Sequence, residues 1–291
     1  MSLDELQGAL AQGDWHLGDL VWWSLSDVRV DRSSLENIWA DARLDPATLP
    51  EIPTDEKALK IAVREMQVGL KEQLIRLGKQ DESEIVFGIV RENRLPDGSL
   101  SYVQEARLSL DRKASVLATD NPRHEVAVGV VSAFRQLRHT HTADDIRRSM
   151  IRVLDSCSAL TLRGHGGVYW VPAPHAQTAR CLRQAIEQIG GSRVHLLPVH
   201  RSREARKTLG EVAQGAIEQE LDALKAEIDG FLATPPERSS TLVRRFDAFD
   251  AIRSRAELYR QILQVQVDDL DLKLAEMTAA VESLLEQRSA A

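Results

Sequence analysis

Apolar residues recur along the chain at spacings typical of strands and amphipathic helices. Strand-like runs rich in aromatic and β-branched residues occupy 19–31, 84–110 and 192–199. The LPDGS turn at 95–99 divides the second run, so we expect an antiparallel hairpin there, which the run at 114–120 extends by a further strand.

Helical spacing predicts a series of helices between these strands. One begins at Thr54 and continues to Gly78, with a single apolar stripe made of Leu59, Val63, Met66, Leu70, Leu74 and Leu77. Thr142 is expected to cap a helix that continues to about Leu160, because Asp144 follows in its first turn. Further helices are expected at 33–39 (capped by Ser33 or Ser34), 124–141 and 175–189.

The last third of the chain has a purely helical pattern. An apolar stripe covers 203–233, and Thr234-Pro235-Pro236 interrupts it. A second stripe runs from Phe249 to Leu284, with two successive four-residue steps from Tyr259 through Leu263 to Val267. We expect a helical hairpin or coiled coil whose second helix, at ~45 residues and ~65 Å, is longer than its partner can cover. Its seam is expected to mediate oligomerisation or docking through Ile252, Tyr259, Leu263, Leu270, Leu274 and Met277.

Together these elements predict an α+β fold, in which helices pack on an antiparallel sheet. We expect three modules: an acidic α+β module at 1–122, a basic, His-rich α+β module at 123–202, and a helical hairpin or coiled coil at 203–291. At 291 residues the chain is long enough for more than one module.

Charge is distributed unevenly over the chain. Residues 123–208 carry 14 Lys and Arg but 6 Asp and Glu, whereas the whole chain has a net charge of -7. The same segment holds seven of the eight histidines. Such asymmetry indicates either a basic surface that meets an anionic partner or a basic segment that packs against its acidic flanks, and the sequence leaves both open.

No familiar catalytic or cofactor motif is present. The GHGG segment at 164–167 is followed by a strand-like run, whereas a phosphate-binding loop requires a helix directly after its glycines. Cys157, His165, His175 and Cys181 are metal-binding residue types, but their spacing matches no standard zinc module. We therefore expect no catalytic residues, no metal and no cofactor.

The order of elements in 142–172 is a helix, a strand, a Gly-rich turn and a second strand. This order resembles the end of a winged helix, in which a recognition helix precedes a β-hairpin wing. On that interpretation the nucleic-acid-binding residues are Arg147, Arg148, Arg152, Arg163 and His165. The alternative is a hairpin that belongs to a small α+β domain, which the continuation into another helix and strand favours.

These observations favour a non-enzymatic binding protein. We expect a cytoplasmic protein that oligomerises or docks through its C-terminal coiled coil and presents a basic surface to nucleic acid. Two alternatives stay open: a scaffold or assembly protein that binds an acidic protein partner, and an enzyme with an unrecognised site. No signal peptide and no membrane helix are expected, since the N-terminus is acidic and no apolar run is long enough.

Overall fold

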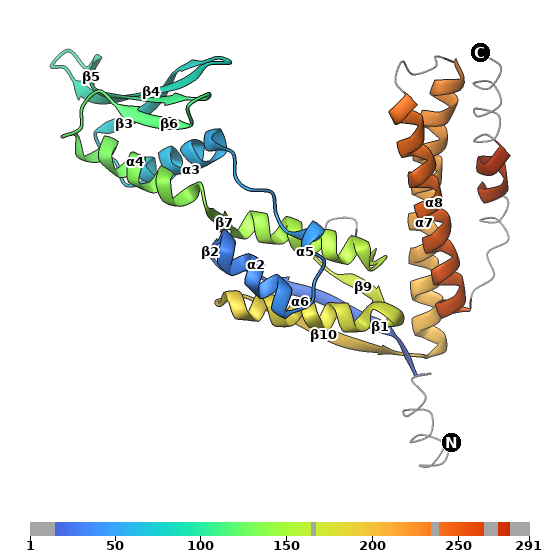
Figure 1. The fold of residues 1–291 in the computed structure, drawn as a ribbon. Coiled ribbons are helices and arrows are strands. Elements are labelled where there is room, and N and C mark those ends of the chain that lie inside the picture. Colours follow the sequence, from blue (N-terminus) through green and yellow to red (C-terminus); the bar gives the residue numbers. More distant parts are fainter. Residues whose placement is uncertain (1–14, 164–166, 234–238, 265–272, 280–291) are drawn as a thin grey trace. The chain divides into compact units, whose positions relative to one another are not determined.

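The chain folds into two compact units of mixed α and β structure (Figure 1). The structure is a computed structural model, and it describes residues 15–163, 167–233, 239–264 and 273–279. Unit 1 comprises residues 1–24, 151–187 and 192–291, and unit 2 comprises residues 25–150 and 188–191. These bounds differ from a division at residues 122 and 202, because unit 1 is assembled from strands that lie far apart in the sequence.

Unit 1 contains a four-stranded antiparallel sheet with the strand order β10-β1-β9-β8. β1 is a central strand that pairs with β9 on one side and with β10 on the other. The strands are β1 (His16–Ser24), β8 (Leu160–Thr161), β9 (Tyr169–Pro172) and β10 (Arg193–His200). Two long helices, α5 (Ala143–Ser156), which begins in unit 2, and α6 (Ala176–Ile189), connect these strands.

The elements of unit 2 from β2 to β7 lie between β1 and α5 in the chain. Without them, the order β1-α5-β8-β9-α6-β10 is that of a split βαβ arrangement. The helix and hairpin of residues 142–172 therefore continue into α6 and β10, and β9 lies inside the sheet between β1 and β8. The winged-helix-like order is not confirmed, because β9 pairs on both sides and so does not project as a wing. The tip at 164–166 lies outside the described residues.

The C-terminal region of unit 1 forms a helical bundle. α7 (Arg203–Ala233) packs against α8 (Ser239–Leu263), and the helical residues 273–279 contribute Met277 to the same buried cluster. The expected single helix of ~45 residues is wrong, since α8 ends at Leu263 and Gln264 has a φ of 54°. The end of α8 at Leu263 coincides with the two successive four-residue steps of the apolar stripe, and the coiled coil is not confirmed.

The bundle and the sheet share one hydrophobic core. Trp170 of β9 is fully buried in the same cluster as Tyr259 of α8, with ring centroids 5.7 Å apart. The Tyr259 hydroxyl donates a hydrogen bond to the carbonyl of Ser158 at 2.8 Å, and burial raises the pKa of this phenol to about 12. Leu17 of β1 and Leu160 of β8 complete the contact, so the bundle packs directly on the sheet.

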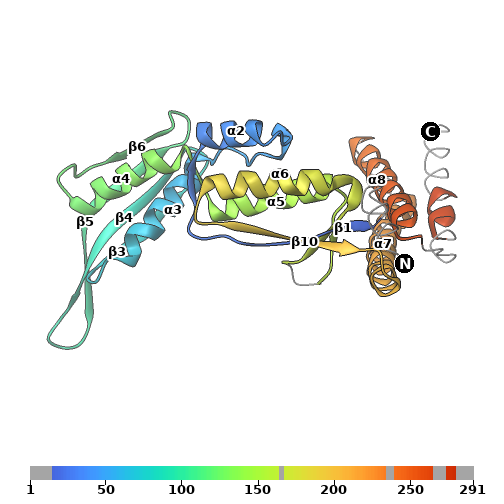
Figure 2. The ribbon, with the colours of Figure 1, turned by 90° about the horizontal axis from the view of Figure 1, so that it is seen from below.

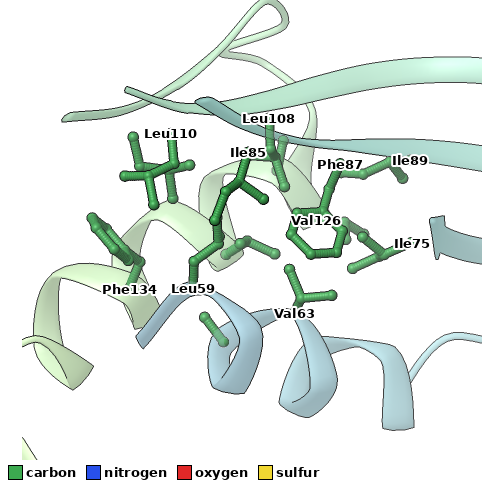
Figure 3. Close-up of a cluster of buried hydrophobic side chains, with 14 of the residues drawn as sticks. Leu59, Val63, Ile75, Ile85, Phe87, Ile89, Leu108, Leu110, Val126 and Phe134 are labelled. Carbon is green, nitrogen blue, oxygen red and sulfur yellow. The ribbon is translucent and has the colours of Figure 1, made fainter. Parts of the chain in front are cut away.

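Unit 2 is built on an antiparallel meander with the strand order β3-β4-β5-β6. Two helices pack on one face of this sheet, and Leu59 and Val63 of the first helix meet Val126 and Phe134 of the second (Figure 3). The elements are α3 (Asp55–Val68), β3 (Gln73–Gln80), β4 (Glu84–Arg94), β5 (Leu100–Asp111), β6 (Val116–Thr119) and α4 (Glu125–Leu137).

The expected helix from Thr54 to Gly78 is correct at its start and wrong at its end. Thr54 caps α3 by accepting a hydrogen bond from the Lys57 amide, but the helix ends at Val68. Residues 73–80 instead form β3, which pairs with β4. The Gln67 side chain stabilises this change of direction, because it donates to the Gln73 carbonyl and accepts from the Ile75 amide.

A short two-stranded antiparallel sheet pairs a segment near the beginning of unit 2 with one near its end. β2 (Arg29–Asp31) pairs with β7 (Thr140–Thr142), and α5 begins directly after β7. Asp31, rather than Ser33 or Ser34, caps α2 (Arg32–Asp41) by accepting from the Ser33 amide. A short 3-10 helix at Pro46–Thr48 follows α2, and a second one at Ala173–His175 precedes α6.

Gly18 is expected to be essential for the junction between sheet and bundle. It has a φ of 143°, and a Cβ at this position would lie 2.1 Å from the Val171 carbonyl oxygen and 2.7 Å from Trp170 Nε1. We predict that Gly18→Ala lowers the free energy of unfolding by about 2–5 kcal/mol, from backbone strain and overpacking. Urea unfolding of the full chain measures this effect.

The matched control for this substitution is Gly215→Ala in α7. A Cβ at Gly215 has no other atom within 4 Å, so alanine should raise the free energy of unfolding by about 0.5–1 kcal/mol. Equal effects of the two substitutions would contradict the assignment of Gly18.

Candidate functional site

The arginines selected from the sequence do not belong to one unit. Arg147 and Arg148 lie in unit 2, whereas Arg152 and Arg163 lie in unit 1. Arg163 is exposed and Arg152 is half-buried, and His165 lies outside the described residues. Neither unit therefore carries the whole predicted set.

Several cations of the basic segment are paired with carboxylates of the same chain. Arg147 contacts Asp144 at 2.6 Å and Arg148 contacts Asp145 at 2.5 Å, each one helical turn apart on α5. Arg138, after α4, contacts Asp55 of α3 at 2.7 Å. These contacts favour the interpretation in which the basic segment packs against acidic partners, at least for this part of unit 2.

Arg148 lines a cleft of about 670 Å³, here called the charged cleft. It lies at the N-terminal turns of α3 and α5, and its cations are Arg29, Lys57, Lys60, Arg64 and Arg148. Acidic neighbours hold most of these cations: Arg29 pairs with Glu65, Lys60 pairs with Glu56, and both Lys57 and Arg148 pair with Asp145. Arg64 makes no ion pair among the described residues, but the other four cations are paired, so the cleft has little net positive charge.

Asp145 lies behind the charged cleft and pairs with two of its lining cations, Lys57 and Arg148. It is 2% exposed, and its carboxylate accepts hydrogen bonds from Lys57 Nζ at 2.6 Å and from the amide and hydroxyl of Thr142, both at 3.1 Å. Burial alone would raise its pKa, but these hydrogen bonds and the one from Arg148 outweigh burial and lower the pKa of Asp145 to about 2. The polar groups around Asp145 are therefore engaged with one another.

His141 lies on β7 close to this carboxylate. It is fully buried, and neither of its ring nitrogens has a hydrogen-bond partner within the described part of the chain. Burial lowers the pKa of His141, and the opposing attraction of Asp145 does not overcome it. The imidazole is accordingly neutral at pH 7 and packs as a core side chain.

The sheet of unit 1 presents a different kind of surface. Leu20 and Trp170 are directly opposite each other and both face the helical bundle. Side chains alternate between the two faces of a strand, so Trp22 lies on the same face as Leu20, two residues further along β1. Opposite Trp22 on β10 is His195, and their rings stack with centroids 5.2 Å apart and planes 20° apart.

This surface, here called the Trp22 face, is only partly covered by described residues. Figure 2 shows α5 and α6 on the other side of the sheet, where Asp19 of β1 meets Arg180 of α6 at 3.7 Å. Trp22 and His195 are half-buried, and Leu197 beside them is 53% exposed. Arg193 occupies the same face of β10 and is exposed, with no ion pair among the described residues.

Trp23 provides the contrast. As the next residue of β1 it points to the opposite face of the sheet, where its ring stacks on Tyr169 with centroids 5.3 Å apart. The two adjacent tryptophans therefore occupy different surfaces. The sequence shows the aromatic pair, but it does not show which of the two faces the helices cover, so the sequence alone does not identify Trp22 as a site residue.

Metal chemistry finds no support in the described residues. No group of three His, Cys, Asp or Glu side chains there is placed to hold a metal ion. Cys157 is buried in an apolar setting that raises the pKa of its thiol, so it is a poor metal ligand and a poor nucleophile.

Comparison with known proteins places the chain in a family without giving it a function. Residues 16–290 match the model of DUF6744, a family of unknown function. The chain belongs to this family. No curated protein and no solved structure matches it. No helix among the described residues of this DUF6744 member is both long and apolar enough to span a membrane.

Asp145 is expected to stabilise unit 2 rather than to bind a ligand. We predict that Asp145→Asn lowers the free energy of unfolding at pH 7 by about 1–3 kcal/mol, a range that allows for solvent screening of the half-exposed Lys57 and Arg148. The neighbouring Asp144→Asn, at an exposed ion pair, should change it by less than about 0.5 kcal/mol.

The effect of Asp145 should depend on pH in a defined direction. Its pKa is about 2 in the folded chain and 3.8 for the free side chain. Its contribution is therefore complete above pH 3.8 and is lost as the pH falls towards 2. Thermal unfolding at a series of pH values should show the wild-type and Asp145→Asn curves converging at acidic pH, and a constant difference would contradict this assignment.

Proposed function

We propose that the chain binds single-stranded nucleic acid on the Trp22 face of unit 1. The observation that carries this proposal is the half-exposed stack of Trp22 and His195 on β1 and β10, on the face opposite α5 and α6. The proposal keeps the expectation of a non-enzymatic nucleic-acid-binding protein and moves the site from the arginines of α5 to the sheet.

Stacking gives the physical basis for this choice. Unpaired bases stack on Trp, Tyr, Phe and His rings, and four-stranded sheets that display such rings bind single-stranded RNA in this way. Each base offers a π surface, so an aromatic platform of this kind binds with little sequence preference. A duplex keeps its bases stacked on one another and has none to offer to Trp22.

Cations near the platform support binding of the backbone. Arg193 lies on the Trp22 face beside His195, and Arg163 lies in the β8–β9 connection at the other edge of the sheet. Both are exposed, and neither makes an ion pair among the described residues. By contrast, Arg147 and Arg148 already neutralise carboxylates, so they are weaker candidates for phosphate contacts.

Self-association through the C-terminal helices stays a prediction, and the seam residues that the structure describes are buried within their own chain. Ile252, Tyr259, Leu263 and Met277 are each 5% exposed or less and belong to the core of their own chain, with Leu274 packed against it. Leu270 lies outside the described residues. We therefore leave oligomerisation out of the proposed function.

The adjacent tryptophans allow a closely matched test. Trp22→Ala should weaken binding of a fluorescent oligothymidine or oligouridine about 5- to 150-fold, since stacking contributes ~1–3 kcal/mol per base. Trp23→Ala removes the same side chain from the other face of the same strand and should leave the affinity unchanged. Fluorescence anisotropy measures binding, and thermal unfolding verifies that both variants are folded.

Salt dependence tests the role of the cations. Arg193→Glu should weaken binding and reduce the slope of log affinity against log salt by about 0.7 for each phosphate contact that is lost. A duplex of the same sequence should bind less tightly than the single strand. The proposal fails if the single strand does not bind at low salt, or if Trp22→Ala and Trp23→Ala bind equally well.

A further inference from the structure

Unit 2 contains a second surface, which is independent of the Trp22 face. β6 is a terminal strand of the meander and pairs with β5 alone. Beside it runs α4 (Figure 2). A groove of about 470 Å³, here called the β6 groove, lies between the two. Leu117 and Thr119 line it from β6, and Val128, Val131 and Arg135 line it from α4.

The register of β6 determines which backbone groups are unpaired. The amide of Asp120 donates to the Arg107 carbonyl, so this pair is of the hydrogen-bonded type. Antiparallel pairs alternate, so the hydrogen-bonded pairs of β6 are Ala118 with Ser109 and Val116 with Asp111. The amides and carbonyls of Leu117 and Thr119 therefore point to the open edge, where the described residues provide no main-chain partner for them.

The helix wall of the β6 groove is formed by one side of α4. Its residues Val128, Val131, Ser132 and Arg135 are three or four positions apart and therefore lie on the same side of the helix. The other side, with Val130 and Phe134, is buried in the core of unit 2. Val128 is 47% exposed although it is apolar, and Val116 at the start of β6 is 55% exposed.

Arg135 gives the groove its charge. It is the one charged side chain that lines the groove, it is exposed, and it makes no ion pair with any described residue. A ligand that fits must therefore supply main-chain donors and acceptors for an edge strand, apolar side chains for the valines, and an anionic group for Arg135.

We propose that the β6 groove binds an extended peptide segment of another protein, which adds to the meander as a fifth strand beside β6. Apolar side chains at alternate positions of this peptide enter the groove, and an acidic side chain or a terminal carboxylate meets Arg135. Main-chain hydrogen bonds to Leu117 and Thr119 supply affinity, while the valines and Arg135 select the sequence.

The first test selects a display library of random octapeptides against the full chain. We expect enrichment of peptides with apolar residues at every second position and an acidic group at one end. The Val128→Asp chain, in which a carboxylate enters the groove, should bind the enriched peptides at least ten-fold more weakly. Val103→Asp on β5, at a residue that is 51% exposed and does not line the groove, is the matched control and should bind them normally.

Two further variants examine the contacts separately. Arg135→Glu should weaken the acidic peptide about ten-fold and leave its amidated or neutral analogue unchanged, whereas Arg94→Glu on β4 should affect neither. N-methylation of the synthetic peptide should abolish binding at the residues whose amides face β6 and be tolerated at the residues between them, because β-sheet pairing alternates. A helical or irregular ligand would not show this alternation.

Three results would overturn the proposal. The first is a library that yields no enrichment. The second is a set of enriched peptides that bind the Val128→Asp and Val103→Asp chains equally. The third is a wild-type chain that dimerises in analytical ultracentrifugation and becomes monomeric with Val128→Asp, since the occupant of the groove would then be a second copy of the chain.

Discussion

Unit 1 depends on the packing of one side chain, the indole of Trp170. β9 pairs with β1 and with β8, so Trp170 is held in the middle of the sheet, and its ring lies against Tyr259 of the helical bundle. Gly18 makes this arrangement possible, because it leaves space where any Cβ would meet the Val171 carbonyl. The sheet and the bundle are therefore two parts of a single core.

This shared core explains how the described part of the C-terminal apolar stripe is buried. A single long helix would expose part of its seam. Instead α8 ends at Leu263, and the helical segment at 273–279 contributes Met277 to the core. Burying the described part of the stripe within one chain removes its apolar area from water without the entropic cost of association. The described residues of the expected oligomerisation seam are thus accounted for by folding: Ile252, Tyr259, Leu263, Leu274 and Met277.

Local sequence signals predicted much of the fold, but they could not predict which distant segments pair with one another. The Thr54 cap and the LPDGS turn act within a few residues, and both were identified correctly. Leu74 and Leu77 keep the helical spacing of α3 after that helix has ended, and only the pairing of β3 with β4 shows that they lie in a strand. The pairing of β1 with β10 joins segments about 170 residues apart, and nothing in either segment specifies the other.

The candidate sites show why charge composition alone does not locate the unpaired cations of a folded chain. A basic segment attracts attention in a sequence, but on α5 its arginines meet Asp144 and Asp145 one turn away, so the folded chain satisfies them internally. A binding surface is instead characterised by groups that the described part of the chain leaves accessible. The half-exposed indole of Trp22, the outward amides of β6 and the guanidinium of Arg135 are such groups, and each becomes recognisable only when strand register and helix face are known. The two surfaces also differ in chemistry, because one offers aromatic rings to bases and the other offers a sheet edge to a peptide.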